Sequence, residues 1–252
     1  MSVSITTQLP KEAIANFVDS FWALHNTGDS EKNVIVLPDG RIDLLFSKSA
    51  AEPYHIILLG LSTQPEQVVV SPHSVTFAIS FKLPAIEYIL QGTVADILDY
   101  AKDVGQKFAH IDAGVLDDFD TFCSKATGKI EQLIPQDLDN RKMKLFDLIY
   151  AFKGNVSVRK LSEQVYWSTR QINRYFNQQL GISIKSYCNI IRFSASFEHI
   201  KHGKLFPEGN YTDQSHFIKE IKKLSGVLPK ELHKNINEQF IQLAGSSNKD
   251  KQ

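Results

Sequence analysis

The spacing of hydrophobic positions divides the chain into a strand-rich first half and a helical second half. Near the start, apolar residues recur at helical intervals from Ala13 to Trp22, which predicts a helix with one buried face. The next apolar runs are rich in Val, Ile and Phe and are separated by turn residues, which predicts strands. These runs are Asn33 to Leu37, Arg41 to Ser47, Tyr54 to Leu59, Gln67 to Val70 and Ser74 to Phe81. Helical spacing returns after Pro84.

This pattern predicts an α+β protein. We expect an N-terminal small β-sheet or barrel with packed helices, followed by an all-α domain. Gly128, Pro135 and the polar run 136–140 indicate a hinge between the two parts. The last residues are too polar to pack, so a disordered tail is expected. The predicted ranges are 1–125 for the N-terminal domain, 126–142 for a linker, 143–240 for the helical domain and 241–252 for the tail.

The helical part contains an internal repeat. Residues 168–185 align with residues 213–230 at a constant offset of 45 residues. Each copy has a short polar residue that can cap a helix, then apolar and cationic residues at fixed intervals, and then a glycine that can end the helix. The matched pairs are Ser168 with Asp213, Ile172 with Phe217, Arg174 with Lys219, Phe176 with Ile221, Gly181 with Gly226 and Ile184 with Pro229. The repeat therefore predicts two small helices, each with a fixed start and stop.

The first copy has the pattern of a helix-turn-helix. Leu161 and Val165 form the apolar stripe of a short helix, and Ser168 with Gln171 forms a capping box that restarts the helix after a turn. On the restarted helix, Thr169, Arg170, Gln171, Asn173, Arg174 and Asn177 fall on the outward face. Arg can bond guanine, and Asn or Gln can bond adenine, through two atoms of the base edge in the major groove. This face therefore has the chemistry of base reading.

Charge is distributed unequally between the two parts. Of the 252 residues, the first 140 contain 9 Lys and Arg against 19 Asp and Glu, and the rest contain 19 against 9. A basic half that carries the repeat is typical of a phosphate binder. The alternative is that the charge serves only solubility and that the outward face is an ordinary solvated one. Acidic residues are absent from 168–196, which favours the DNA interpretation.

At these residues the sequence resembles the AraC-type (AraC/XylS) transcription regulators, whose DNA-binding domain carries two helix-turn-helix units joined by a long helix. The likeness also extends to the N-terminal segments FVDSFW, LPDGRIDLLF and FKLPAIEYIL, which resemble an uncharacterised sensor-like domain of such regulators. The residues that carry it in the helical part are Leu161, Ser168, Ile172, Arg174, Phe176, Gly181, Ser183, Tyr187 and Arg192, and then Asp213, Ser215, Phe217, Lys219, Lys222, Lys223, Gly226 and Pro229.

The resemblance implies which residues contact DNA. Base contacts would fall on Arg170, Asn173 and Arg174 in the first unit and on Gln214, Ser215 and Lys219 in the second. The full expected set is Thr169, Arg170, Asn173, Arg174, Asn177, Gln214, Ser215, Lys219, Lys222 and Lys223.

Two departures from the family pattern affect this expectation. Tyr166 stands in the first turn where a glycine is usual. The stretch between Arg192 and Tyr211 is about five residues short, so the second reading helix is expected to keep its place while its supporting helix is shortened. The second unit is then expected to contact mainly phosphate through its lysines, with Gln214 and His216 reaching bases only if the short support still aims the helix.

No catalytic residue, metal site or cofactor is expected. The histidines of the first half are scattered singly, and Cys123 and Cys188 lie far apart, which disfavours a zinc site or a disulfide. Asp39, Arg41 and Asp43 fit a structural turn with a salt bridge at least as well as an acid-base group. No apolar run is long enough to cross a bilayer, so a cytoplasmic protein without a membrane partner is expected.

The resulting prediction is a sequence-specific DNA-binding transcription regulator with an N-terminal domain for ligand sensing or dimerisation. Its expected partners are double-stranded DNA in the major groove, a small-molecule effector of unknown identity, a second copy of the chain and RNA polymerase. The alternative is a protein-protein adaptor, or an N-terminal enzyme whose helical domain is degenerate and does not bind DNA.

Overall fold

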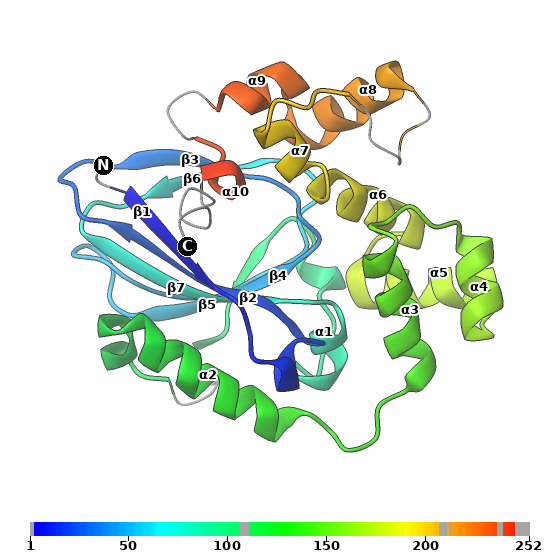
Figure 1. The fold of residues 1–252 in the computed structure, drawn as a ribbon. Coiled ribbons are helices and arrows are strands. Elements are labelled where there is room, and N and C mark those ends of the chain that lie inside the picture. The colour runs from blue at the N-terminus through cyan, green and yellow to red at the C-terminus, as the bar shows by residue number, and fades with distance from the viewer. Residues whose placement is uncertain (1–2, 106–110, 207–210, 212, 236–238, 245–252) are drawn as a thin grey trace. The chain divides into compact units, whose positions relative to one another are not determined.

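The chain folds into two compact units (Figure 1). The computed structural model describes residues 3–105, 111–206, 211, 213–235 and 239–244. One unit comprises residues 1–33, 41–61 and 69–138, and the other comprises residues 34–40, 62–68 and 139–252. Two N-terminal segments therefore cluster with the helices, which the contiguous ranges expected from the sequence do not include. The α+β class is confirmed.

The first unit is built on an open antiparallel sheet. Its six strands have the order β1-β2-β7-β4-β5-β8, so β1 and β8 form the edges. All five strands predicted from the sequence are present to within about two residues, and two of them, β3 and β6, pair in a separate sheet. The strands are β1 Val3–Gln8, β2 Val18–Asn26, β3 Lys32–Val36, β4 Ile42–Lys48, β5 His55–Leu59, β6 Glu66–Val70, β7 Ser74–Phe81 and β8 Ala101–Asp103.

The helix predicted over Ala13 to Trp22 is wrong. A single 3-10 turn, η1, spans Glu12–Ile14, and strand β2 follows it. The apolar residues are buried as expected, with Phe17 at 2% and Phe21 at 1% exposure. Because β2 is hydrogen-bonded to β1 on one side and to β7 on the other, backbone pairing along both edges outweighs a short helical periodicity.

A long helix, α2 (Phe119–Leu133), covers one face of this sheet (Figure 1). The fully buried ring of Phe122 lies 5.1 Å from the ring of Phe46 and 5.4 Å from that of Phe77, centroid to centroid. Shorter elements complete the unit: α1 Pro84–Tyr88, η2 Ala95–Ile97 and η4 Ala113–Asp117.

The linker predicted at 126–142 is too long. Helix α2 runs through Gly128 as far as Leu133, because Ala126 and Ile130 continue its buried stripe and offset the cost of a glycine, about 1 kcal/mol relative to alanine. The connecting loop is 134–139, and helix α3 begins at Asn140.

The second unit is helical. Helix α3 packs against α4 and α6, and α5 packs against both α4 and α6. Its core contains Leu145, Ile149, Leu161, Ile172 and Phe176, each at 0% exposure. The helices are α3 Asn140–Ala151, α4 Val158–Val165, α5 Thr169–Leu180, α6 Ile184–Ser194, α7 Phe197–Lys201, α8 Gln214–Ser225, α9 Pro229–Lys234 and α10 Ile241–Ala244.

A glycine allows the turn between α3 and α4 to approach α6. Gly154 has φ +72°, and a Cβ atom there would lie 2.2 Å from the carbonyl oxygen of Cys188. The guanidinium of Arg192 also donates a hydrogen bond of 3.2 Å to the Gly154 carbonyl. Both contacts fix α6 against the turn.

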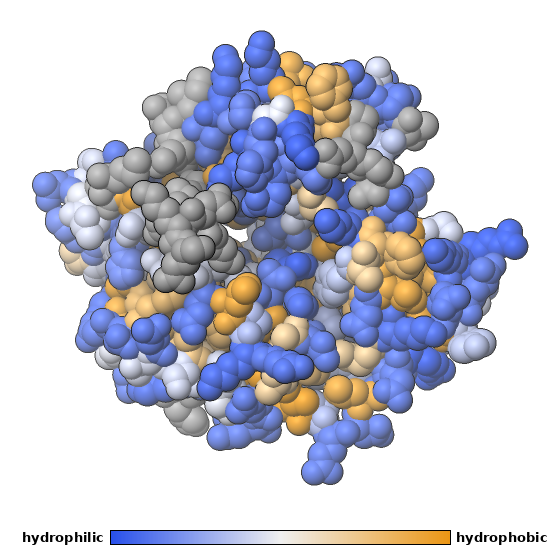
Figure 2. All heavy atoms as spheres, viewed as in Figure 1, coloured by the Kyte–Doolittle hydropathy of each residue, from blue (hydrophilic) through white to orange (hydrophobic). Residues whose placement is uncertain are grey.

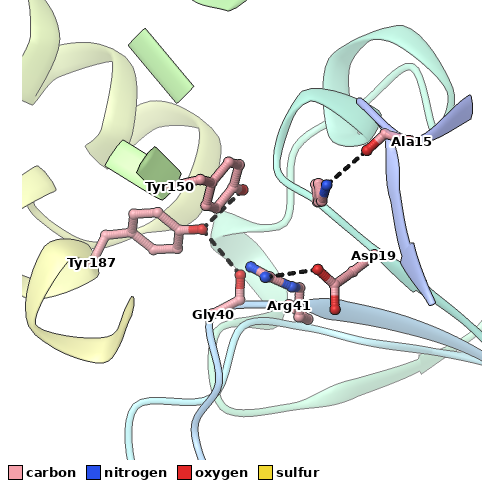
Figure 3. A network of polar contacts seen from close by, with 7 residues as sticks. Ala15, Asp19, Gly40, Arg41, Tyr150 and Tyr187 are labelled. Carbon is pink, nitrogen blue, oxygen red and sulfur yellow. Dashed lines mark hydrogen bonds and ion pairs between the residues drawn. The ribbon is translucent and has the colours of Figure 1, made fainter. Parts of the chain in front are cut away.

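The segment Val34–Gly40 is held by the helical unit through a tyrosine (Figure 3). The Tyr187 hydroxyl of α6 donates to the Gly40 carbonyl at 3.1 Å, so Tyr150 of α3 donates to Tyr187 at 3.1 Å. Gly40 has φ +79°, and the methyl end of Ile191 lies 2.5 Å from the position of an added Cβ. A side chain at residue 40 would therefore be strained by the left-handed backbone and would push the end of the Ile191 side chain aside.

Within the first unit, the same figure shows an ion pair of Arg41 with Asp19, an acid that the sequence did not indicate as its partner. Arg41 donates to the carboxylate of Asp19 on β2 at 2.8 Å (Figure 3). Lys82 donates to the carbonyl of Ala15 at 2.7 Å. Arg41 thus has a structural role in joining β2 and β4.

The C-terminal tail predicted at 241–252 is wrong for its first residues. Residues 241–244 form helix α10, and Leu243 is 6% exposed. The Gln242 amide receives a hydrogen bond from the Leu37 N–H at 3.0 Å and donates one to the Leu37 carbonyl at 2.8 Å. The segment packs here because it is mainly apolar and because the backbone of Leu37 satisfies its one polar side chain. Residues 245–252 lie outside the described residues.

The two glycines at 154 and 128 provide a matched test of packing. Gly154→Ala should lower the free energy of unfolding by roughly 2–5 kcal/mol. Alanine is strained in the left-handed conformation of this residue, and its Cβ clashes with the backbone of Cys188. Gly128→Ala should raise it by roughly 0.5–1 kcal/mol, because nothing lies within 4 Å of the new methyl group and alanine favours a helix. Urea unfolding of the full chain measures both, and equal effects would contradict the close approach.

Candidate nucleic-acid interface

The two repeated helices have the same length and the same ends. Helices α5 and α8 each contain 12 residues, and their bounds differ by the 45-residue offset. Ser168 caps α5 by accepting a hydrogen bond from the Gln171 N–H at 3.2 Å, and the Gln171 side chain accepts one from the Ser168 N–H at 2.9 Å. Asp213 caps α8 by accepting from the His216 N–H at 2.8 Å. The capping box and the second cap are as predicted.

Glycine ends both helices, also as predicted. Gly181 follows α5 with φ +75°, and Gly226 follows α8 with φ +77°. Only glycine adopts this left-handed conformation without steric cost, so the two stops are fixed by residue type.

Each helix buries one face of the repeat. In α5, Ile172 and Phe176 are at 0% exposure, and in α8 Phe217 and Ile221 are at 2% and 0%. The expected contact residues are exposed on the other side, except Asn173, which is half-buried. The exposed ones are Thr169, Arg170, Arg174, Asn177, Gln214, Ser215, Lys219, Lys222 and Lys223.

The outward stripe of α5 combines guanidinium and amide groups. Arg170, Arg174 and Asn177 lie at i, i+4 and i+7, which places them on one line along the helix. The outer side of α4 and α5 carries mainly hydrophilic residues (Figure 2). On α8 the equivalent positions hold Ser215 and the ammonium groups of Lys219 and Lys222, which act as point charges and not as planar forks.

Asn173 has a local partner that sequence reasoning missed. Its side-chain amide donates to the Thr169 carbonyl at 2.9 Å, one turn earlier in α5. Asparagine commonly bonds its own helix in this way. One of its amide hydrogens is therefore used within the helix.

The turn before α5 contains an exposed residue in a strained conformation. Tyr166 ends α4 with φ 55° and ψ 34°, and the residue is 87% exposed. This is the position at which the sequence has Tyr in place of the expected glycine. The left-handed conformation costs a residue with a side chain roughly 1–2 kcal/mol.

The helix before α8 is short, and α8 packs against α6 and α9. Helix α7 contains 5 residues, against 8 in α4. His216 does not join the outward face of α8, since its ring lies 5.8 Å from that of Tyr211 and its Nδ1 is buried. Residues 207–210 and 212, between α7 and α8, lie outside the described residues.

Arg192 ties the second half of this unit to the first. Besides its hydrogen bond to Gly154, its guanidinium lies 6.0 Å from the ring centroid of Tyr211, whose hydroxyl donates to the Arg192 carbonyl at 3.4 Å. The sequence indicated Arg192 only as part of a linking helix.

Neither cysteine has an activated thiol. Burial, with a smaller contribution from the charge of Asp120, raises the pKa of Cys123 to about 12, and burial raises the pKa of Cys188 to about 11. Among the described residues, no group of three or more His, Cys, Asp or Glu side chains could hold a metal ion. Nor does any described helix combine the length and the apolar character needed to cross a membrane.

Comparison with protein families gives one match, to a domain of unknown function named DUF6597, over residues 6–103. This range covers less than half of the chain and extends from β1 to the end of β8. It agrees with the expectation of a poorly characterised N-terminal domain. No curated protein matches the chain.

Several solved structures resemble the chain, among them crystal structures of ToxT from Vibrio cholerae. A 1.65 Å structure has 15% identity and a TM-score of 0.43, and the match covers 91% of this chain and 96% of ToxT. ToxT bound to (E)-4-(8-methylnaphthalen-1-yl)but-3-enoic acid has 16% identity, a TM-score of 0.44 and coverages of 96% and 98%. ToxT with a bound unsaturated fatty acid has 15% identity and a TM-score of 0.39, and the match covers 91% of this chain and 93% of ToxT. At these low values, no function, ligand or residue role of ToxT is transferred to this chain.

Replacing Tyr166 tests the strain in the turn. Tyr166→Gly should be more stable than Tyr166→Ala by about 1 kcal/mol, because both remove an exposed ring and only glycine relieves the left-handed conformation. Chemical unfolding of the two variants gives the difference. Equal stability of the two variants would show that the turn does not hold φ above zero.

The raised pKa values of Cys123 and Cys188 predict that both thiols react slowly with disulfide reagents. At pH 8 both thiols should be protonated in the folded chain, because thiolate accumulates only as the pH approaches about 11. A disulfide reagent should therefore label the native chain slowly and the urea-unfolded chain rapidly at both cysteines. Rapid labelling of one cysteine in the native chain would reveal an activated thiol.

Proposed function

We propose that this chain is a sequence-specific DNA-binding transcription regulator of the AraC type. Helix α5 enters the major groove and reads base edges, with Arg170, Arg174 and Asn177 as its contacts and Asn173 and Thr169 beside them. The observation that supports this proposal best is the exposed stripe of α5. Two guanidinium groups and one side-chain amide lie along it, and the opposite face of the helix is buried. Those groups match guanine and adenine edges.

Helix α8 has a different part in the proposal. Lys219, Lys222 and Lys223 contact phosphates, and Gln214 and Ser215 lie at the N-terminal end, where base contacts are made in helix-turn-helix proteins. Lysine neutralises phosphate without distinguishing bases, and α8 packs on α6 and α9, whereas α5 packs on the eight-residue α4 as well as on α6. The first unit then supplies most of the sequence preference.

The N-terminal unit would sense a ligand or mediate assembly. Its described residues line an open hollow of about 420 Å³ between the C-terminal end of β2 and the loop after β4. Asn26, Lys48 and His73 are among the lining residues. Volumes of this size accommodate small molecules. Dimer formation and contact with RNA polymerase remain predictions of the family resemblance.

The path of the chain offers a route for such regulation. Gly40 belongs to the helical unit and is held by Tyr187, whereas Arg41 and strand β4 belong to the sheet unit. The chain therefore passes from the helical unit into the sheet unit between these two residues, and we propose that regulation acts through this connection.

A genomic footprint with the full chain should identify bound sites, and a duplex carrying one of them then permits quantitative tests. The affinity of the full chain should fall steeply with salt, with a slope of about −0.9 per neutralised phosphate. Arg174→Ala should lose roughly 1–3 kcal/mol of binding free energy and relax the preference at one base pair. Lys125→Ala, which removes an exposed cation from α2 of the other unit, is the matched control and should bind as the parent does.

The alternative function predicts a different result. A protein-protein adaptor, or an enzyme with a degenerate helical domain, would show salt-insensitive or absent DNA binding. An Arg174→Ala variant with unchanged affinity and base preference would also reject the proposed reading helix. Circular dichroism of each variant separates lost contacts from lost folding.

A further inference from the structure

A cluster of cations and aromatic rings lies beside the N-terminal end of α5, outside the residues that the proposed function uses. Trp167 directly precedes the capping residue Ser168, and its ring lies 5.7 Å from that of Tyr175 in an edge-to-face arrangement. The Arg141 guanidinium lies 5.4 Å from the centre of the Trp167 ring, and the Lys142 ammonium lies 5.3 Å from that of Tyr175. The first turn of α3 thus makes one cation-π contact with the turn before α5 and one with α5 itself.

We propose that Arg141 and Lys142 form a phosphate clamp, which holds the DNA strand alongside α5 through its backbone. This inference rests on the proposed function and names a further part of the same interface. The aromatic pair Trp167 and Tyr175 positions the two cations.

The width of the groove is the first argument. The major groove is about 12 Å wide, and a helix with its side chains is about 10–12 Å across. The flanks of an inserted helix therefore face the phosphates on either side. Tyr175 follows Arg174 in sequence and so lies about 100° farther round α5, between the reading stripe and the buried face. Lys142 above this ring is placed at a flank of the inserted helix.

The position of Trp167 is the second argument. In helix-turn-helix proteins the N-terminal residues of the second helix reach the base edges, so the turn before that helix lies near the DNA. Trp167 is in that turn, and Arg141 stacks over it. Arg141 is 56% exposed in its side chain, so a ring beneath it leaves the guanidinium accessible to a phosphate.

Asp139 prepares the arginine for this contact. Its carboxylate accepts from Nε of Arg141 at 3.3 Å and from a terminal nitrogen at 3.1 Å, and these bonds hold the pKa of Asp139 below its usual range. Asp139 also caps α3 through the Arg141 N–H at 2.9 Å. A guanidinium has five N–H donors, so this pairing leaves donors for phosphate while it fixes the direction of the group. Arg141 and Lys142 carry two positive charges, and Asp139 carries one negative charge, so the group stays positive.

The ordinary alternative is a structural role, in which the cations only join α3 to α5. Salt dependence separates the two because it counts neutralised phosphates, whereas a structural contact does not alter it. The experiment measures the slope of log affinity against log salt for the full chain on a footprint-derived duplex and on an unrelated duplex. Thermal unfolding of the same samples reports on the structural contact.

Arg141→Gln and Lys142→Gln should each reduce the magnitude of the slope by about 1 on both duplexes, with the base preference unchanged. Arg141→Lys keeps the charge and should retain the slope of the parent. Trp167→Leu keeps both cations but removes the ring under Arg141. Its slope should therefore fall by less than the slope of Arg141→Gln.

Lys144→Gln is the matched control. Lys144 lies in the same turn of α3 and is exposed, so the variant loses the same charge. Its slope should equal that of the parent. A reduction in Lys144→Gln as large as in Arg141→Gln would overturn the clamp in favour of a general charge effect, and unchanged slopes in both Arg141→Gln and Lys142→Gln would overturn it as well.

The two proposals can fail separately. If Arg174→Ala relaxes the base preference while the slopes of Arg141→Gln and Lys142→Gln stay at the parent value, the clamp is wrong and the reading helix stands. If the parent chain has no salt-dependent affinity for either duplex, the proposed function itself is rejected.

Discussion

The outward side chains of α5 and α8 are determined by the apolar stripe that each helix buries. Successive residues lie about 100° apart around a helix, so the burial of Ile172 and Phe176 turns Arg170 and Arg174 outward. Ser168 and Asp213 fix the start of the two helices by satisfying backbone donors, and Gly181 and Gly226 fix the end by accepting a left-handed conformation.

The two copies of the repeat share this frame and differ in everything that faces outward. The first copy has a longer supporting helix, planar donors and an aromatic pair that fastens a further helix to it. The second has a five-residue support and lysines. A duplicated scaffold has thus been kept where packing requires it and altered where solvent allows it. This division is expected when geometry is fixed by buried residues and chemistry by exposed ones.

Local signals explain which parts of the fold could be predicted from the sequence. Turn residues such as Gly40 and Pro72 separate the strands, and the cap and stop residues define α5 and α8. These elements could be predicted because their signals lie in residues adjacent in the sequence. The segment Ala13 to Trp22 was misread because strand β2 pairs on both sides, with β1 near the start of the chain and with β7, whose residues lie more than fifty positions away at Trp22. The same reason applies to Gln242, whose partner is Leu37, at a separation of 205 residues. Short polar segments reveal such partners only in three dimensions.

The candidate site divides in the same way. Helical spacing alone placed the exposed stripe of α5, because the buried residues at 172 and 176 determine it. It did not show that Asn173 bonds its own helix, since a side chain of that type has equally good partners in water. It also missed the stacking of Arg141 on Trp167, which joins α3 to the turn before α5. A sequence search for pairs of basic and aromatic residues flanking a predicted reading helix would have provided that signal.

The pairing of Gln242 with Leu37 bears on how the protein is made. A ribosome releases the N-terminal segment early, yet the backbone groups of Leu37 find their partner only when the chain is almost finished. Contacts of such long sequence separation form late and slow the folding of a domain. During synthesis, the backbone groups of Leu37 therefore bond water until Gln242 has been made. A C-terminal fragment beginning at residue 139 would lack the segment 34–40, so Gln242 of its last helix would have no Leu37 to bond.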